Sequence, residues 1–181
     1  MRIGYKILLV VGVVFSLVFM VGLVWYVGAC RVDEDRQTLI PQNASVVITL
    51  ERTICFGDCP SYRLEIHDDG RVLYEGAKHV RQAGQHSAQI SQADVQRLIA
   101  GFEDLNYYAL VADYHRAANP LCVRDDYEWR RHAPDVITSL SVNGQRTEIT
   151  HYHGLLNAPE ELYALEDLID EVANSEQWVK R

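Results

Sequence analysis

Residues 135–152 read DVITSLSVNGQRTEITHY, and this stretch predicts a β-hairpin. Its centre, Asn143-Gly144, is the dipeptide most typical of a two-residue hairpin turn, because both turn residues take positive φ. A turn at this point sets the register of the two strands and places Val136 opposite His151. The apolar side chains of the hairpin then share the face that carries His151. We therefore expect His151 to point toward the core, near the end of the sheet.

Shorter strand patterns precede this hairpin. Apolar residues alternate along residues 45–51, SVVITLE, and along residues 62–67, YRLEIH. The turn sequence DDG at residues 68–70 is followed by residues 71–75, which return antiparallel. A further short extended piece is expected around residues 86–90. The hairpin strands themselves are expected over residues 135–142 and 145–152.

A capping box predicts where the first helix begins. Ser91 supplies a hydroxyl for the free N–H groups of the first turn, and Asp94, three residues later, supplies a carboxylate. Apolar residues recur at helical spacing from Val95 to Leu105. We expect an amphipathic helix over residues 92–105.

A second helix is expected at the C-terminal end of the chain. Residues 157–160, NAPE, predict its start, with Pro159 inside the first turn and Glu160 as the capping partner. The buried stripe is expected to consist of Leu162, Leu165, Leu168, Ile169 and Val172. The opposite, solvated face is expected to carry Glu161, Glu166, Asp167, Asp170 and Glu171.

These elements define a fold class. Tight turns between strands imply antiparallel pairing, and two amphipathic helices can cover one face of a sheet. The expected order is βββ-α-ββ-α, which makes an α+β two-layer sandwich with both helices packed on one face. Residues 45–181 are long enough to bury one independent core, so we expect a single domain there.

The first 30 residues have a different character. Residues 7–27, ILLVVGVVFSLVFMVGLVWYV, carry no charge and at helical rise span about 31 Å, the thickness of a hydrocarbon core. Arg2 and Lys6 precede this segment and acidic residues follow it, which places the N-terminus in the cytosol. We expect a single transmembrane helix, a polar linker over residues 31–44 and an extracytoplasmic domain.

An alternative interpretation of the N-terminus remains open. Residues 27–30, VGAC, resemble the lipobox at which a bacterial signal peptide is removed and the cysteine is lipidated. Residues 1–30 would then be a lipoprotein signal, and the mature chain would be anchored at Cys30. The apolar run is longer than the core of an ordinary signal peptide, which favours the uncleaved anchor. Both alternatives place the remaining chain outside the cytosol.

The charge balance excludes one class of partner. The 181-residue chain holds 17 basic and 25 acidic residues, for a formal net charge of −8. A nucleic-acid-binding protein needs a basic surface that displaces the counterions of phosphates, so we expect no nucleic-acid partner. The chain also contains no glycine-rich phosphate loop and no His-Glu-x-x-His helix. We therefore assign no catalytic residues.

Two cysteines lie in the turn between the first two strands. Cys55 and Cys59 can form a disulfide if their Cα atoms come within about 7 Å, and thiols outside the cytosol tend to be oxidised. Either residue could instead pair with Cys122. A third hypothesis is a redox or copper site in which Cys55, Cys59 and His151 act as ligands, because thiolate and imidazole suit copper.

Two histidines on the last strand form a second candidate site. His151 and His153 are two residues apart, so both project from one face of a strand. Most such histidines are packed and hydrogen-bonded, and a metal-binding role is the less common alternative.

The cysteine turn also carries a resemblance. Residues 50–62, LERTICFGDCPSY, resemble the opening of the bacterial domain of unknown function 6438 family, through the pattern Cys-x-Gly-x-Cys-Pro-x-Tyr. The resemblance covers about residues 44–180. Many relatives have a cysteine at the position of Leu155, and its replacement here leaves Cys122 without the partner that it has in them. The family has no established activity, so the resemblance implies no catalytic residue. Further points of similarity are Asp69-Gly70, Val72, Tyr74-Glu75-Gly76, Asn143-Gly144, Thr150-His151-Tyr152, residues 165–170 and Trp178.

Two functions are consistent with these patterns. We favour a non-enzymatic domain of the cell envelope, tethered to the bacterial inner membrane by residues 7–27, that binds a protein or a small ligand and needs no cofactor. Its periplasmic domain would use the sheet or the loop at residues 107–134. The alternative is a thiol-based redox or copper-handling protein. The aromatic residues near that loop, which could contact a partner or fix the loop to the core, are Tyr107, Tyr108, Tyr114, Tyr127 and Trp129.

Overall fold

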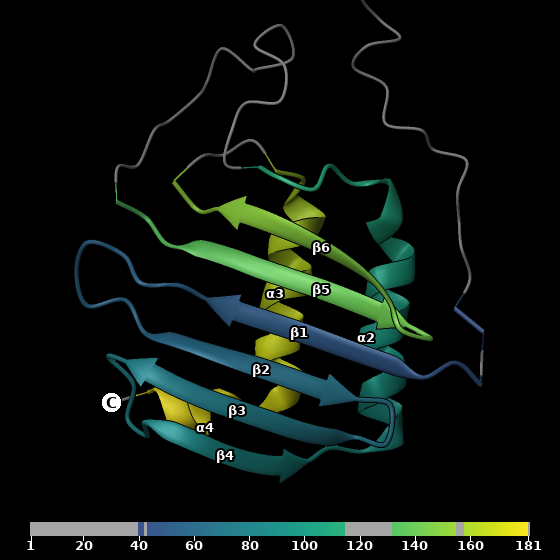
Figure 1. The fold of residues 1–181 in the computed structure, drawn as a ribbon, viewed down its shortest axis with the longest axis horizontal. Coiled ribbons are helices and arrows are strands. Elements are labelled where there is room, and N and C mark those ends of the chain that lie inside the picture. Colours follow the sequence, from purple (N-terminus) through teal and green to yellow (C-terminus); the bar gives the residue numbers. More distant parts are fainter. Residues whose placement is uncertain (1–39, 42, 115–131, 155–157, 181) are drawn as a thin grey trace, which may run out of the picture. The chain divides into compact units, whose positions relative to one another are not determined.

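The computed structural model describes residues 40–41, 43–114, 132–154 and 158–180 (Figure 1). Within these ranges no helix is long and apolar enough to cross a membrane. The predicted anchor at residues 7–27, the alternative lipidation site at Cys30, and Cys122 lie outside the described residues. The same holds for the aromatic residues Tyr127 and Trp129.

The described chain forms one six-stranded sheet in which every neighbouring pair is antiparallel. The strand order is β4-β3-β2-β1-β5-β6, so the first strand of the chain lies in the middle of the sheet. The strands are β1 (Val46–Arg52), β2 (Ser61–His67), β3 (Arg71–Lys78), β4 (Gly84–Gln89), β5 (Asp135–Val142) and β6 (Gln145–Tyr152).

The predicted strand order, βββ-α-ββ-α, is one strand short, although the extended piece expected around residues 86–90 is present as β4. Four strands, not three, precede the first long helix, because Gly84–Gln89 pairs with β3 along its length. This strand, GQHSAQ, lies at the edge of the sheet and holds no large apolar residue. Its stability comes from backbone pairing with β3, which hydrophobic alternation cannot reveal.

The hairpin is formed as its sequence predicts. Asn143 and Gly144 have φ angles of 51° and 82°, the positive values that a two-residue turn requires. Val136 of β5 is paired with His151 of β6, which confirms the predicted register. His151 therefore projects from the face of the sheet that packs against the helices.

Two long helices, α2 (Gln92–Asp104) and α3 (Glu160–Ala173), cover one face of the sheet and cross its strands (Figure 1). This arrangement confirms the predicted α+β class. Ser91 caps α2, because its hydroxyl accepts a hydrogen bond from the Asp94 N–H at 3.2 Å. A one-turn 3₁₀ helix, η1 (Tyr107–Ala109), and a short helix, α4 (Glu176–Val179), complete the described elements.

The start of α3 differs from the prediction. Pro159 is the residue before the helix rather than a member of its first turn, and no side chain caps the free N–H groups. Proline suits this position because it fixes φ and brings no N–H of its own. Asn157, expected to open the helix, lies outside the described residues.

The core lies between the sheet and the two helices. Alternate strand residues point toward the helices, and the central ones, such as Ile48, Leu50 and Leu64, are fully buried. Leu162, Leu165 and Ile169 of α3 pack against them. Both helices are thus held by apolar burial, which supplies most of the folding free energy of such a layer.

Candidate functional site

One end of the sheet carries polar side chains on the face that α3 covers. Arg52, the last residue of β1, is paired with Tyr62 of β2 on one side and with Val136 of β5 on the other. Val136 is paired in turn with His151 of β6. Residues directly opposite each other on neighbouring strands share a face. Arg52, Tyr62 and His151 therefore form one row, which lies beneath the polar side chains of α3.

Glu166 of α3 meets this row at β6. Its carboxylate oxygen Oε1 lies 2.7 Å from His151 Nδ1, and Oε2 lies 2.6 Å from His153 Nε2. The Glu166 side chain is only 1% exposed. The prediction that Glu166 belongs to a solvated acidic face is therefore wrong. We call Glu166, His151 and His153 the histidine cluster.

The histidine cluster holds Glu166 in its ionised form. Burial alone would raise the pKa of this carboxyl group, because the charged form loses water. The hydrogen bonds from His151 and His153, together with the attraction between the groups, reverse that effect and lower the pKa below its ordinary value. An ionised carboxylate only accepts hydrogen bonds, so each histidine nitrogen that faces it donates.

Aromatic rings enclose the histidine cluster. The Tyr163 ring lies edge-on to His151, at 4.3 Å between ring centroids, and 5.2 Å from His153. The His151 ring is fully buried, and its second nitrogen, Nε2, has no hydrogen-bond partner among the described residues. His153 remains 24% exposed, so the cluster opens to solvent on the His153 side.

One turn further along α3, Asp170 forms a second polar cluster with the same row. Asp170 accepts hydrogen bonds from Arg52 Nε at 2.8 Å, from the Tyr62 hydroxyl at 2.7 Å and from the Ser175 hydroxyl at 2.6 Å. Burial and the negative charge of Asp170 raise the pKa of Tyr62. Asp170, also predicted to be solvated, therefore joins α3 to β1 and β2. We call these four residues the arginine cluster.

The cysteine turn lies between β1 and β2. The sulfur atoms of Cys55 and Cys59 are 1.92 Å apart and form a disulfide, with a Cα–Cα distance of 5.6 Å that satisfies the predicted limit. The Phe56 N–H donates a hydrogen bond to the His132 carbonyl at 3.2 Å, and the two rings pack at 4.9 Å. The Phe56 side chain is nevertheless 84% exposed.

The proposed ligands of the predicted copper site have other partners in this structure. Cys55 and Cys59 are joined to each other, whereas His151 lies in the histidine cluster. In the described part of the chain, the candidate group of metal ligands comprises His151, His153 and Glu166, and it contains no cysteine. The copper hypothesis with Cys55, Cys59 and His151 stays a prediction, and pairing of either cysteine with Cys122 is not what this structure contains.

Three of the predicted contact aromatics serve the core. Tyr107 is fully buried, and its hydroxyl lies 2.9 Å from the Thr138 hydroxyl. Tyr114 is also buried, and Tyr108 is half-buried against the core. These rings fix the segment after α2 to the domain, which leaves the cysteine turn as the more exposed aromatic surface.

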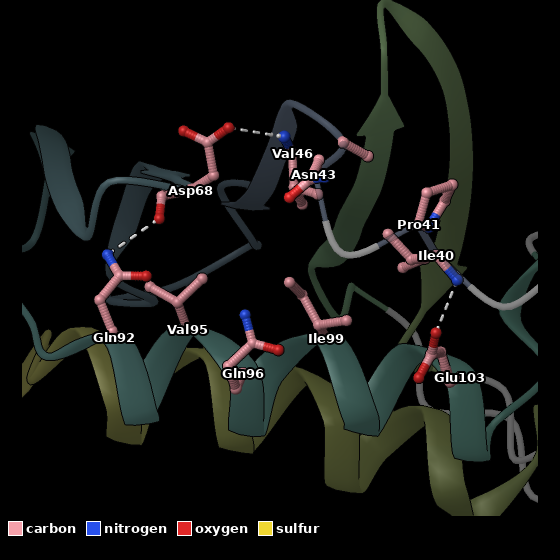
Figure 2. Close-up of a pocket in the computed structure, with 11 residues that line it drawn as sticks. Ile40, Pro41, Asn43, Val46, Asp68, Gln92, Val95, Gln96, Ile99 and Glu103 are labelled. Carbon is pink, nitrogen blue, oxygen red and sulfur yellow. Dashed lines mark hydrogen bonds between the residues drawn. The ribbon is translucent and has the colours of Figure 1, made fainter.

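A groove lies where the chain enters the domain (Figure 2). Residues 40–41, 43–44 and 46 form one wall, and α2 forms the other, with the side chains of Val95 and Ile99 facing the gap. The Ile40 N–H donates to Glu103 at 2.7 Å, and the Val46 N–H donates to Asp68 at 3.1 Å. These bonds join the end of the predicted linker to the domain, so Glu103 and Asp68 in the groove have structural partners.

Sequence reasoning missed Glu166 because it sorted helix residues by polarity alone. A weak signal was present, since Glu166 lies four residues after Leu162 and three before Ile169. Those spacings place all three side chains on one helical face. Asp170 follows at the next spacing of four.

Two comparisons with known proteins bear on this site. The family model described as Domain of unknown function (DUF6438) matches residues 46–173, and the chain belongs to this family. The match begins at β1 and ends with α3, so it spans the cysteine turn, the arginine cluster up to Asp170 and the histidine cluster. No curated protein matches the chain.

Proposed function

We propose that this member of the family is a non-enzymatic, membrane-tethered domain of the bacterial cell envelope that binds a protein partner through the cysteine turn. The observation that carries the proposal is the exposure of Phe56, 84%, on a loop that a disulfide closes. Ile54, two residues before Phe56, is 58% exposed. Together they form an apolar tip between β1 and β2.

The loop suits partner binding because its shape is fixed before a partner arrives. The Cys55–Cys59 bond and the hydrogen bond from Phe56 to His132 both restrain its backbone. A preorganised aromatic side chain loses little conformational entropy on binding, and such residues dominate the affinity of many interfaces. A large apolar side chain in water is otherwise a cost in solubility, so its presentation on a fixed loop favours a binding role.

The other side of the sheet supports the choice of this loop. The face away from the helices carries charged pairs, such as Glu51 with Arg63 at 3.5 Å. Among the exposed large apolar residues of the described chain, Leu73 belongs to that face, and it is less exposed than Phe56 or Ile54. A polar, self-paired surface offers little apolar area to a partner.

The tether rests on the sequence of residues 7–27 and on the charges of Arg2 and Lys6 before it. A disulfide in the domain is consistent with an oxidising compartment outside the cytosol. A reporter enzyme that is active only in the periplasm, fused after Arg181, should be active. A stable but inactive fusion would contradict the proposed topology.

Site-specific photo-crosslinking tests the binding role. A photoreactive amino acid replaces Asp58, whose side chain is 95% exposed beside Phe56, in the full chain expressed in its host. We expect an adduct of discrete mass that Phe56→Ser abolishes and that Leu73→Ser, a matched control on the sheet, retains. The proposal is wrong if position 58 gives no adduct, or if Phe56→Ser leaves the adduct intact.

A further inference from the structure

We propose that His151, His153 and Glu166 bind a divalent transition-metal ion, and that Zn²⁺ is the ion their donor atoms suit best. The proposal concerns the interior of the domain and is independent of partner binding at the cysteine turn. It also replaces the cysteine ligands of the copper hypothesis with a carboxylate and a second histidine.

The donor atoms of His151, His153 and Glu166 converge on one point of the domain. The three residues each offer one donor atom, and these atoms all lie within 4.8 Å of one another. They come from β6, from the residue directly after it and from α3, and the sheet register and helix packing hold all three segments. The His153 N–H donates to the Pro134 carbonyl at 3.1 Å, which extends the β5–β6 pairing to that residue.

The distances between the histidine nitrogens and the Glu166 oxygens are those of hydrogen bonds. In each bond a proton occupies the position that a metal ion would take. His151 Nδ1 and His153 Nε2 lie 2.7 Å and 2.6 Å from separate oxygens of Glu166. Zinc binds such donors at about 2.0–2.2 Å in a tetrahedral arrangement. Donor atoms of a tetrahedral ion then lie about 3.3–3.6 Å apart. Each histidine nitrogen must therefore move away from its Glu166 oxygen by about 0.6–1 Å, which a side-chain rotation can supply.

The charges favour a cation at this position. Arg52 neutralises Asp170 in the neighbouring arginine cluster, through a bond of 2.8 Å. Glu166, by contrast, has two histidines as its hydrogen-bond partners, and a neutral histidine brings no compensating charge. A buried carboxylate without a counter-charge is costly, and either a proton on a histidine or a bound metal ion supplies one.

The chemistry of the donors selects the class of ion. Two imidazoles and one carboxylate suit Zn²⁺ and other divalent transition-metal ions. Mg²⁺ and Ca²⁺, by contrast, prefer sites made of oxygen ligands. Three protein ligands leave one tetrahedral position for a further ligand.

Titration of the metal-free full chain in detergent tests the proposal. Cys30 and Cys122 are first replaced by serine, so that their sulfur atoms cannot bind the ion, and the Cys55–Cys59 disulfide is left oxidised. A chromophoric chelator then competes for Zn²⁺, and Co²⁺ serves as a spectroscopic probe. We expect one equivalent of Zn²⁺ per chain and a tetrahedral Co²⁺ spectrum.

Matched variants assign the ion to the site. His153→Ala should lower Zn²⁺ affinity at least about 10-fold, and because His153 is partly exposed the fold should survive. His79→Asn is the control, because His79 also lies beside a carboxylate, Asp58 at 3.4 Å, but on the surface. His153→Gln, which keeps a polar side chain, is measured if the alanine variant fails to fold. Absence of Zn²⁺ binding in the parent chain, or binding that the His153 variants leave unchanged, would overturn the proposal.

Discussion

The histidine cluster and the arginine cluster lie one helical turn apart on α3, and each is built around one acid of that helix, the fully buried Glu166 or the partly buried Asp170. Asp170 has a permanent cation, Arg52, and accepts hydrogen bonds from two hydroxyls, so its charge and its oxygens are satisfied. Glu166 has two histidines, whose charge depends on a proton. The first arrangement fixes the helix to the sheet, and the second leaves the acid open to exchange of its cation.

Removal of the two acids should lower the free energy of unfolding by different amounts. Removal of Asp170 leaves the Arg52 guanidinium without its main partner, and a guanidinium cannot lose its charge. Removal of Glu166 leaves two imidazoles that can become neutral. We therefore expect the arginine cluster to contribute more to stability than the histidine cluster.

The largest effect is expected for Asp170→Ala. This change leaves Arg52 half-buried without its partner and should lower the free energy of unfolding by about 3–5 kcal/mol, as measured by urea denaturation. Asp167→Asn is the control, because Asp167 also lies near Arg52, at 3.4 Å, but is 83% exposed. Equal losses for the two variants would show that the buried pair has no special role.

An intermediate effect is expected for Glu166→Gln measured in the presence of EDTA. The amide keeps the size of the side chain but removes the charge that both histidines face, at a cost of about 1–3 kcal/mol. The parent chain should be further stabilised by Zn²⁺ and the variant should not, which a thermal melt with and without the ion can show. A variant as stable as the parent in EDTA would mean that the cluster contributes no stability.

A smaller effect is expected from alkaline pH, through Tyr62 of the arginine cluster. Its pKa is raised above the ordinary value of about 10, first by burial and then by Asp170. The contribution of Tyr62 to the free energy of unfolding is therefore fully present below pH of about 10. It is lost as the pH rises further, because Tyr62 ionises more readily in the unfolded chain than in the folded one. The loss is at most about 1.4 kcal/mol per pH unit for one tyrosine.

Tyr62→Phe tests this dependence when the urea midpoint is followed from about pH 9 to pH 11. The variant should lose stability less steeply than the parent. Tyr107, whose pKa burial also raises, accounts for part of the remaining slope. Parallel slopes for parent and variant would contradict the role of Tyr62.

The smallest effect is expected for Glu171→Gln. Glu171 lies on the same helix and pairs with Arg97 of α2 at 3.0 Å, but both side chains are more than half exposed. Exposed pairs contribute about 0–1 kcal/mol, so the urea midpoint should barely move. A loss as large as that of Glu166→Gln would remove the distinction between buried and solvated acids on α3.

Much of the fold could be predicted because its signals are local. The Asn143-Gly144 turn and the Ser91 capping box each act within four residues, and both are formed as predicted. The edge strand β4 could not be predicted with the same certainty, because its six residues carry no buried apolar stripe. It pairs with β3, and the partner rather than its own sequence decides its structure.

The candidate site could be predicted only in part. The hairpin register placed His151 on the core side correctly. It did not name Glu166, because the partner lies on a separate helix and resembles its solvated neighbours in sequence.

The sequence by itself determined the two long helices and the strands, their order apart from β4, and the face on which His151 lies. These follow from turn chemistry and from the periods of helix and strand. Only the tertiary structure decided which acids of α3 are buried. Which acids are buried depends on the path that α3 takes across the sheet. On this path Asp170 contacts Arg52, which lies 118 residues earlier in the sequence. Long-range packing between α3 and the sheet sets this path. As a result, Glu166 and Asp170, which resemble the other acids of α3 in sequence, form the centres of two different clusters.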